Sequence, residues 1–200
     1  MTSAQLIKDV GETTADSKSR FGPGQRDMWY FILFDSSVFS CYLISYIIFR
    51  IKNPAEFLAS QEQMSQGLGI FNTVLLLTSS WFLARCVRYT RHNELSRALQ
   101  YLMLTAVAGV SFMVVKSIEW FLAIKSGFTL TYSLYFSFYY FITGFHMVHM
   151  AVGLVALFYI YHNLRNPKDN VLYSVETGST YWHMVDLLWV YIFALLYLMR

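Results

Sequence analysis

Charged residues are scarce in this 200-residue chain: Asp, Glu, Lys and Arg together make up 14% of it. Hydrophobic residues make up 56% and aromatic residues 18%, which is more apolar surface than one small soluble core can bury. Long uncharged stretches account for the excess, because about 20 apolar residues are enough to cross a hydrocarbon layer about 30 Å thick. The sequence therefore predicts an integral membrane protein.

Cysteine is also rare, since only Cys41 and Cys86 occur and they fall in separate apolar stretches. No Cys-x-x-Cys or Cys-x-x-Cys-His pattern is present, so neither a structural zinc nor a covalently attached haem is signalled. Nothing resembles a phosphate-binding loop or a nucleophile elbow. The net charge of +3 gives no case for nucleic acid as a partner.

Five apolar segments are long enough to cross a membrane, and they cover residues 28–49, 67–89, 97–121, 132–161 and 181–199. All should be helices, because unpaired backbone polar groups are too costly in lipid. Short connections with turn residues, such as Asn53-Pro54, separate them. We expect an all-α membrane protein, with one bundle of five transmembrane helices occupying residues 28–200.

A polar tail of residues 1–27 precedes the first segment and lacks the apolar run of a cleaved signal peptide. Ten Lys and Arg residues lie in this tail and in the loops on its side of the membrane, against five on the other side. Positively charged loops remain cytoplasmic. We therefore expect a cytoplasmic amino terminus and tail, and an external carboxyl terminus.

Tryptophans lie near the ends of several segments, where an indole ring prefers the headgroup level. We expect Trp29, Trp81, Trp120 and Trp182 to be such anchors, with Trp189 deeper.

Seven ionisable side chains fall inside the apolar segments, where each is costly and is a functional candidate: Asp35, Lys116, Glu119, His146, His149, His183 and Asp186. Asp35 lies roughly 10 Å below the cytoplasmic boundary. Two interpretations remain open for it. Asp35 either exchanges protons or binds a lipid headgroup, or it hydrogen-bonds to nearby serines in a contact between helices.

His146 and His149 are three residues apart and share a helix face, as do His183 and Asp186. Two such faces can hold a metal, or two imidazoles can clamp a haem. The same residue types also form hydrogen bonds between membrane helices. We favour a buried polar network over a metal site.

Two further charged pairs lie close to segment ends. Lys116 and Glu119 are expected to pair while the lysine stem extends outward to the membrane surface. Arg85 and Arg88, at the cytoplasmic end of the second segment, are expected to bind anionic lipid headgroups.

Five motifs occur in order along the segments: Met28-Trp-Tyr-Phe-Ile-Leu-Phe-Asp35, Asn72-Thr73, Glu119-Trp120, Thr143-Gly-Phe-His146-Met-Val-His149 and Tyr181-Trp-His183-Met-Val-Asp186. In this order and spacing the chain resembles the haem-copper oxidase subunit III family, typified by cytochrome c oxidase subunit 3. The family commonly has Glu where this chain has Asp35. Three stretches look like the nitric-oxide-reductase-associated branch, often called NorE: Ser60-Gln61, the run from Leu75 to Phe82, and the run from His183 to Trp189.

The resemblance implies a subunit without catalytic residues or bound cofactors, located in the bacterial cytoplasmic (inner) membrane. It implies packing against a haem-copper catalytic subunit, either oxidase subunit I or the nitric oxide reductase large subunit, whose haem and copper or iron do the redox chemistry. It further implies phospholipid binding and support of proton uptake. By the same resemblance, Asp35 and Glu119 would be the membrane carboxylates associated with protons or lipid. His146, His149, His183 and Asp186 would be buried polar residues.

Two other functions are compatible with the residues. One is a membrane cytochrome with bis-histidine haem, using His146 or His149 together with His183. The other is a small proton-coupled transporter centred on Asp35 and the histidines.

Overall fold

The computed structural model of the chain describes residues 26–167 and 171–199. The predicted polar tail, residues 1–27, lies outside the described residues except for its last two positions, which begin the first helix. Lys168 and Arg200, which contribute to the predicted orientation, also lie outside them. The orientation in the membrane stays a prediction.

The described chain is built of helices joined by short turns. In order they are α2 (Arg26–Lys52), α3 (Pro54–Glu62), α4 (Gln66–Arg91), α5 (Leu95–Lys125), α6 (Leu134–Arg165), α7 (Val171–Phe193) and a π-helical turn, η2 (Ala194–Leu198). Five stretches are long and apolar enough to cross a membrane: Met28–Lys52, Gln66–Arg91, Leu95–Lys125, Leu134–Arg165 and Val171–Leu198. The prediction of an all-α protein with five membrane helices is confirmed.

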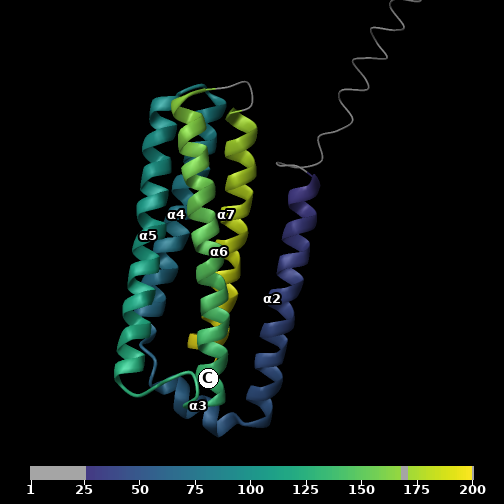
Figure 1. Cartoon of the computed structure of the whole chain (residues 1–200), viewed down its shortest axis with the longest axis vertical. Coiled ribbons are helices and arrows are strands. Elements are labelled where there is room, and N and C mark those ends of the chain that lie inside the picture. The colour runs from purple at the N-terminus through teal and green to yellow at the C-terminus, as the bar shows by residue number, and fades with distance from the viewer. Residues whose placement is uncertain (1–25, 168–170, 200) are drawn as a thin grey trace, which may run out of the picture.

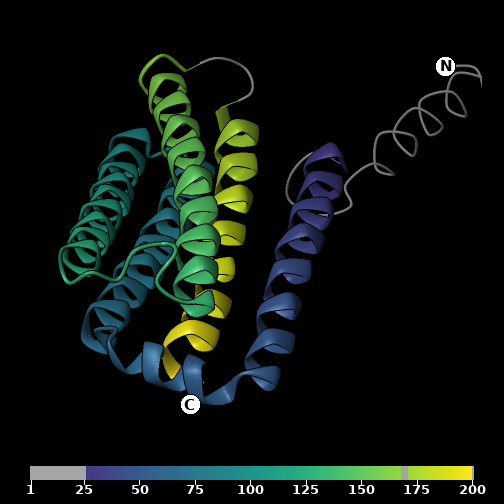
Figure 2. The same ribbon diagram turned by 60° about the horizontal axis from the view of Figure 1, so that its bottom comes forward.

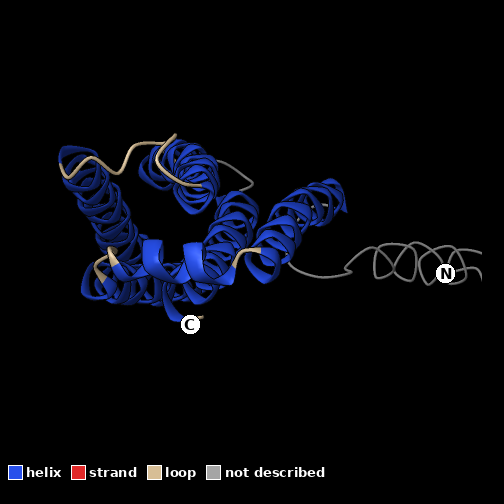
Figure 3. Ribbon diagram, turned by 90° about the horizontal axis from the view of Figure 1, so that it is seen from below, coloured by secondary structure: helices blue, strands red, loops and turns tan. Residues whose placement is uncertain are grey.

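Four of these helices, α4 to α7, pack side by side as an antiparallel bundle, and α2 lies beside it against α7 and α6 (Figure 1). Seen from the end where the carboxyl terminus lies, α2 stands at one edge of the group of helices, opposite α5 (Figure 3). The Tyr46 hydroxyl of α2 donates to the Leu195 carbonyl at 3.3 Å. Arg50 donates to the Gln61 side chain at 3.0 Å and to the Met199 carbonyl. These contacts join α2 to the carboxyl-terminal end of the chain.

The segment after Asn53 was expected to be a short connection, and this was wrong. Pro54 begins the short helix α3, because a proline at the first helical position needs no hydrogen-bond donor there. The Phe57 ring of α3 is fully buried, 5.5 Å from the Tyr46 ring and 6.1 Å from the Tyr135 ring. The helix therefore closes the end of the bundle between α2 and α4 (Figure 2).

The fifth membrane helix begins at Val171, ten residues earlier than the predicted 181–199 segment. The polar run Glu176-Thr-Gly-Ser-Thr180 lies before the predicted segment and within the helix. In the structure Glu176 pairs with Arg91 of α4, with its carboxylate 2.9 Å from the guanidinium. Gly178 lies against Ile160 of α6. These contacts hold the polar turns in helical form despite their low hydropathy.

The prediction for Trp182 as a headgroup anchor is also wrong, because its side chain is 1% exposed. The indole lies against Gly109 of α5 and Gly153 of α6, and its Nε1–H donates to Ser79 Oγ of α4 at 3.0 Å. Because α7 begins at Val171, Trp182 lies in the middle of the helix. Its ring there contacts α4, α5 and α6. Trp29 and Trp81, in contrast, are 41% and 56% exposed on the outer surface.

Candidate functional site

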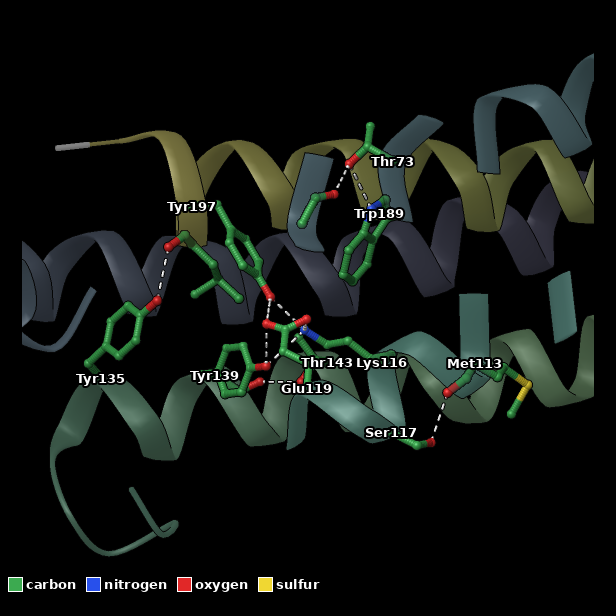
Figure 4. Close-up of polar contacts among 12 residues, drawn as sticks. Thr73, Met113, Lys116, Ser117, Glu119, Tyr135, Tyr139, Thr143, Trp189 and Tyr197 are labelled. Atoms are coloured by element: carbon green, nitrogen blue, oxygen red, sulfur yellow. Dashed lines mark hydrogen bonds and ion pairs between the residues drawn. The ribbon is translucent and has the colours of Figure 1, made fainter. Parts of the chain in front are cut away.

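The most enclosed polar cluster joins α5, α6 and η2 around Lys116, which is fully buried (Figure 4). Its ammonium Nζ lies 3.3 Å from Glu119 Oε2 and donates to the hydroxyls of Tyr139 and Tyr197 at 2.9 Å and 2.6 Å. Both tyrosine hydroxyls in turn donate to Glu119 Oε1. We call these four residues the lysine cluster.

The lysine cluster is saturated, since an ammonium group has three N–H donors and all three are used. The Tyr139 ring also lies 4.5 Å from Nζ, which adds a cation–π contact. The predicted pairing of Lys116 with Glu119 is therefore correct in geometry. The expected outward extension of the lysine is wrong, because the two tyrosines solvate the ammonium inside the bundle.

A second polar contact links α2 to α6. His149 Nε2 lies 3.0 Å from Asp35 Oδ1, and both side chains are close to nine-tenths buried. The other ring nitrogen, Nδ1, lies 2.8 Å from the Phe145 carbonyl oxygen. The neighbouring Ser37 and Ser40 hydroxyls donate to carbonyls of their own helix. Asp35 therefore pairs with His149 and not, as one of the two interpretations had it, with these two serines.

The surroundings of this pair limit its protonation states. A carbonyl oxygen only accepts hydrogen bonds, so His149 Nδ1 carries the hydrogen that faces Phe145. The contact between Nε2 and Asp35 Oδ1 then holds one proton, on either the ring or the carboxyl. In both cases the total charge of the pair is zero. Asp35 Oδ2 is buried and has no described hydrogen-bond partner.

A third polar contact lies between α4 and α7. Ser80 Oγ is 2.5 Å from His183 Nδ1. Asp186, one turn further along α7, is 4% exposed. Neither of its carboxyl oxygens has a described partner of hydrogen-bond geometry, although the Ser80 hydroxyl is close enough to interact with it.

His146 is the most isolated of the candidate residues. It is fully buried, its ring packs 5.6 Å from the Phe112 ring and 5.2 Å from the Trp189 ring, and neither ring nitrogen has a described partner. The four residues predicted to form one polar network are therefore distributed over separate contacts. His149 reaches α2, His183 reaches α4, and His146 and Asp186 form no described hydrogen bonds.

These positions do not fit a bis-histidine haem. His149 faces Asp35 and Phe145, His183 faces Ser80, and His146 is enclosed by aromatic rings. Among residues 26–167 and 171–199, no three His, Cys, Asp or Glu side chains lie close enough together to hold a metal ion.

The two predicted lipid-contacting arginines differ in their surroundings. The Arg85 guanidinium lies over three aromatic rings, those of Trp81, Tyr89 and Tyr101, at 5.5 to 5.8 Å from their centroids. Arg88, three residues on, is exposed. The exposed Arg88 guanidinium is thus better placed to bind a headgroup than that of Arg85, which contacts aromatic side chains of α4 and α5.

Sequence reasoning missed the partners of the charged residues. Tyr139, Tyr197 and Ser80 were not singled out, yet they provide the main polar contacts of Lys116, Glu119 and His183. Each partner comes from a different helix, so spacing along the sequence carried no signal for it. Only the general cost of an unpaired buried charge indicated that partners had to exist.

Comparison with known proteins identifies the family. Residues 30–200 match the family model described as cytochrome c oxidase subunit III. The chain is 27% identical to cytochrome c oxidase subunit 3 of Synechocystis sp., over 100% of this chain and 88% of that protein. It is 27% identical to the Bacillus subtilis protein of the same name, over 94% and 90%. It is also 26% identical to a heme-copper oxidase subunit I+III of Aeropyrum pernix, over 86% of this chain and 22% of that protein. The chain belongs to the cytochrome c oxidase subunit III family.

Proposed function

We propose that this chain is an accessory subunit of a haem-copper respiratory complex and carries no redox centre. The observation that carries the proposal is the family match over residues 30–200, which covers all five membrane helices except the first two residues of Met28–Lys52. The Aeropyrum relative supports a direct association with the catalytic subunit, because its name places subunits I and III in one chain. Haem and copper or iron then reside in the partner, and this chain stabilises it in the bacterial cytoplasmic membrane.

The Asp35–His149 pair is proposed to support proton uptake by the complex. The pair holds one proton at zero net charge, so losing that proton or gaining a second creates a buried net charge. We propose that a change of charge in the partner subunit offsets this cost, so that the pair gains or releases a proton. Asp35 lies in the half of α2 nearer the predicted cytoplasmic end, from which protons are taken up. Glu119, in contrast, is proposed to be a structural carboxylate, because its contacts in the lysine cluster are complete.

Phospholipid is the second proposed partner. Large apolar side chains such as Phe34, Val155 and Phe158 are 69% to 70% exposed on the outer surface, where acyl chains would cover them. Arg88 is exposed at the end of α4 that is predicted to be cytoplasmic. We propose that it binds an anionic headgroup, with Arg85 held close by its aromatic neighbours.

The terminal acceptor is either oxygen or nitric oxide. The relatives named above are oxidase subunits, whereas Ser60-Gln61 and the run from Leu75 to Phe82 resemble the nitric-oxide-reductase branch. Ser60 and Gln61 are both buried in α3, where Ser60 Oγ lies 3.1 Å from Ser133 Oγ and Gln61 accepts from Arg50. These residues serve a structural contact, so they do not favour either acceptor by their chemistry.

Purification of the tagged chain from its native membrane in mild detergent tests the proposal. We expect a haem-copper catalytic subunit among the partners identified by mass spectrometry, and a haem spectrum proportional to it. The identity of that subunit separates oxidase from nitric oxide reductase. An unrelated tagged membrane protein is the control for non-specific recovery. A colourless chain recovered alone contradicts the accessory role and favours a transporter, whereas a haem spectrum from the chain alone favours a cytochrome.

A further inference from the structure

An open groove runs between α4 and α7 near the Arg91–Glu176 ion pair and has a volume of about 230 Å³. Its walls combine apolar Ala84 and Val87 with polar Ser179, Thr180 and His183. A water molecule occupies about 30 Å³ in the liquid, so the groove has room for several. The groove thus gives water access to the contact between α4 and α7, which we call the α4–α7 seam.

His183 connects this groove to the interior of the seam. Its ring lines the groove, and its Nδ1 contacts Ser80 Oγ of α4. Its Nε2 has no described hydrogen-bond partner, and the residue is partly exposed. One ring nitrogen is therefore available to water while the other is in contact with a hydroxyl inside the bundle.

The interior end of the seam is Asp186, which lies on the same face of α7 as His183. Its side chain is buried, and neither carboxyl oxygen has a described partner of hydrogen-bond geometry. Charged and titratable groups on the surrounding helices include Arg85, Arg88, Arg91, Lys116, Glu119, His146, His149, Glu176 and Asp35. The described ion pairs join Arg91 to Glu176, Lys116 to Glu119 and His149 to Asp35, and none includes Asp186. A carboxyl enclosed in this way needs a hydrogen-bond donor, and the Ser80 hydroxyl, which also contacts His183, is close enough to interact with it.

We propose that water enters the α4–α7 groove and that His183 and Ser80 relay protons between this water and the carboxyl of Asp186. A proton bound at His183 Nε2 allows Nδ1–H to pass its proton to Ser80 Oγ. Ser80 passes its own hydroxyl proton to the Asp186 carboxylate, forming one O–H bond there. Each relay group ends with as many protons as it began, and no electron moves. The site adds a proton-exchanging carboxyl at a place distinct from the Asp35–His149 pair.

Infrared spectroscopy of the purified full-length chain in lipid vesicles tests this inference. The difference between wild type and Asp186→Asn, recorded over a pH series, identifies the protonated Asp186 carboxyl band. Transfer to D2O is expected to shift that band without global unfolding. If Asp186→Asn fails to fold, 13C labelling of aspartate carboxyls combined with Asp186→Glu assigns the band instead.

The relay itself is tested by removing one hydroxyl. Ser80→Ala is expected to slow the D2O shift of the Asp186 band about tenfold or more, while Ser80→Thr, which keeps a hydroxyl, retains fast exchange. Ser117→Ala is the matched control, because Ser117 is exposed and donates to a carbonyl of its own helix.

The proposal is overturned if no protonated Asp186 band occurs at any pH at which the chain is folded. It is also overturned if the band does not shift in D2O, or shifts equally fast in Ser80→Ala. The test uses the chain alone, so it can fail while assembly with a catalytic subunit stands.

Discussion

Trp182 of α7 lies so close to Gly109 of α5 that a Cβ atom at residue 109 would be 2.7 Å from the indole Cη2. Gly153 of α6 contacts the same ring from another side, with its Cβ position 3.0 Å away. The indole therefore occupies space that two neighbouring helices leave open by having no side chain. This close packing fixes where α5, α6 and α7 meet.

Gly109→Ala is expected to destabilise the chain by about 1–3 kcal/mol, because an added methyl group overpacks a site bounded by a rigid ring. The lower melting temperature is measurable by thermal unfolding of the purified chain in detergent. Gly144→Ala is the matched control, since its added Cβ meets nothing closer than 3.6 Å. Equal melting temperatures for the two variants would contradict the role of the Trp182 contact.

Lys116→Met is expected to cost about 3–5 kcal/mol, because it leaves the Glu119 carboxylate buried without its cation. The double variant Lys116→Met, Glu119→Gln is expected to recover part of this loss, since it removes both charges. Denaturant or thermal unfolding measures the difference. Arg97→Met serves as the control, because its pair with Glu94 is exposed and should matter little. Were the double variant less stable than the single one, the charge explanation would fail.

Asp35→Asn is expected to lower the rate of proton uptake by the assembled complex, because an amide cannot exchange the proton shared with His149. Asp35→Glu keeps the carboxyl and should retain more of the rate. A pH-indicator dye measures proton uptake during turnover, and co-purification of the subunits verifies assembly. Unchanged turnover and proton uptake in Asp35→Asn would rule out the proposed role of this carboxyl.

Arg88→Gln is expected to weaken binding of anionic phospholipid more than Arg85→Gln does. Arg88 is exposed, whereas the Arg85 guanidinium is occupied by three aromatic rings. Native mass spectrometry of the chain with phosphatidylglycerol, and with zwitterionic phosphatidylcholine as the control without net charge, measures the retained lipid. A larger loss in Arg85→Gln would reverse the assignment of the headgroup site.

The five membrane helices were predictable because length and hydropathy act locally, one segment at a time. The start of α7 was missed for the same reason. Residues 176–180 are polar, and their helical turns pack through contacts with other helices, such as those of Glu176 with Arg91 and of Gly178 with Ile160. Likewise, α3 is short and polar, and it depends on the packing of Phe57 between rings of α2 and α6.

By itself, the sequence determined five segments long and apolar enough to cross a membrane, a resemblance to subunit III, and which buried ionisable groups required partners. Only the tertiary structure decided which partners they have. Lys116 and Glu119 share two tyrosines from α6 and η2, Asp35 contacts His149 across 114 positions, and His183 contacts Ser80 across 103. The physical reason is that membrane insertion depends on the composition of single helices, whereas satisfying a buried charge depends on side chains that only helix packing brings together.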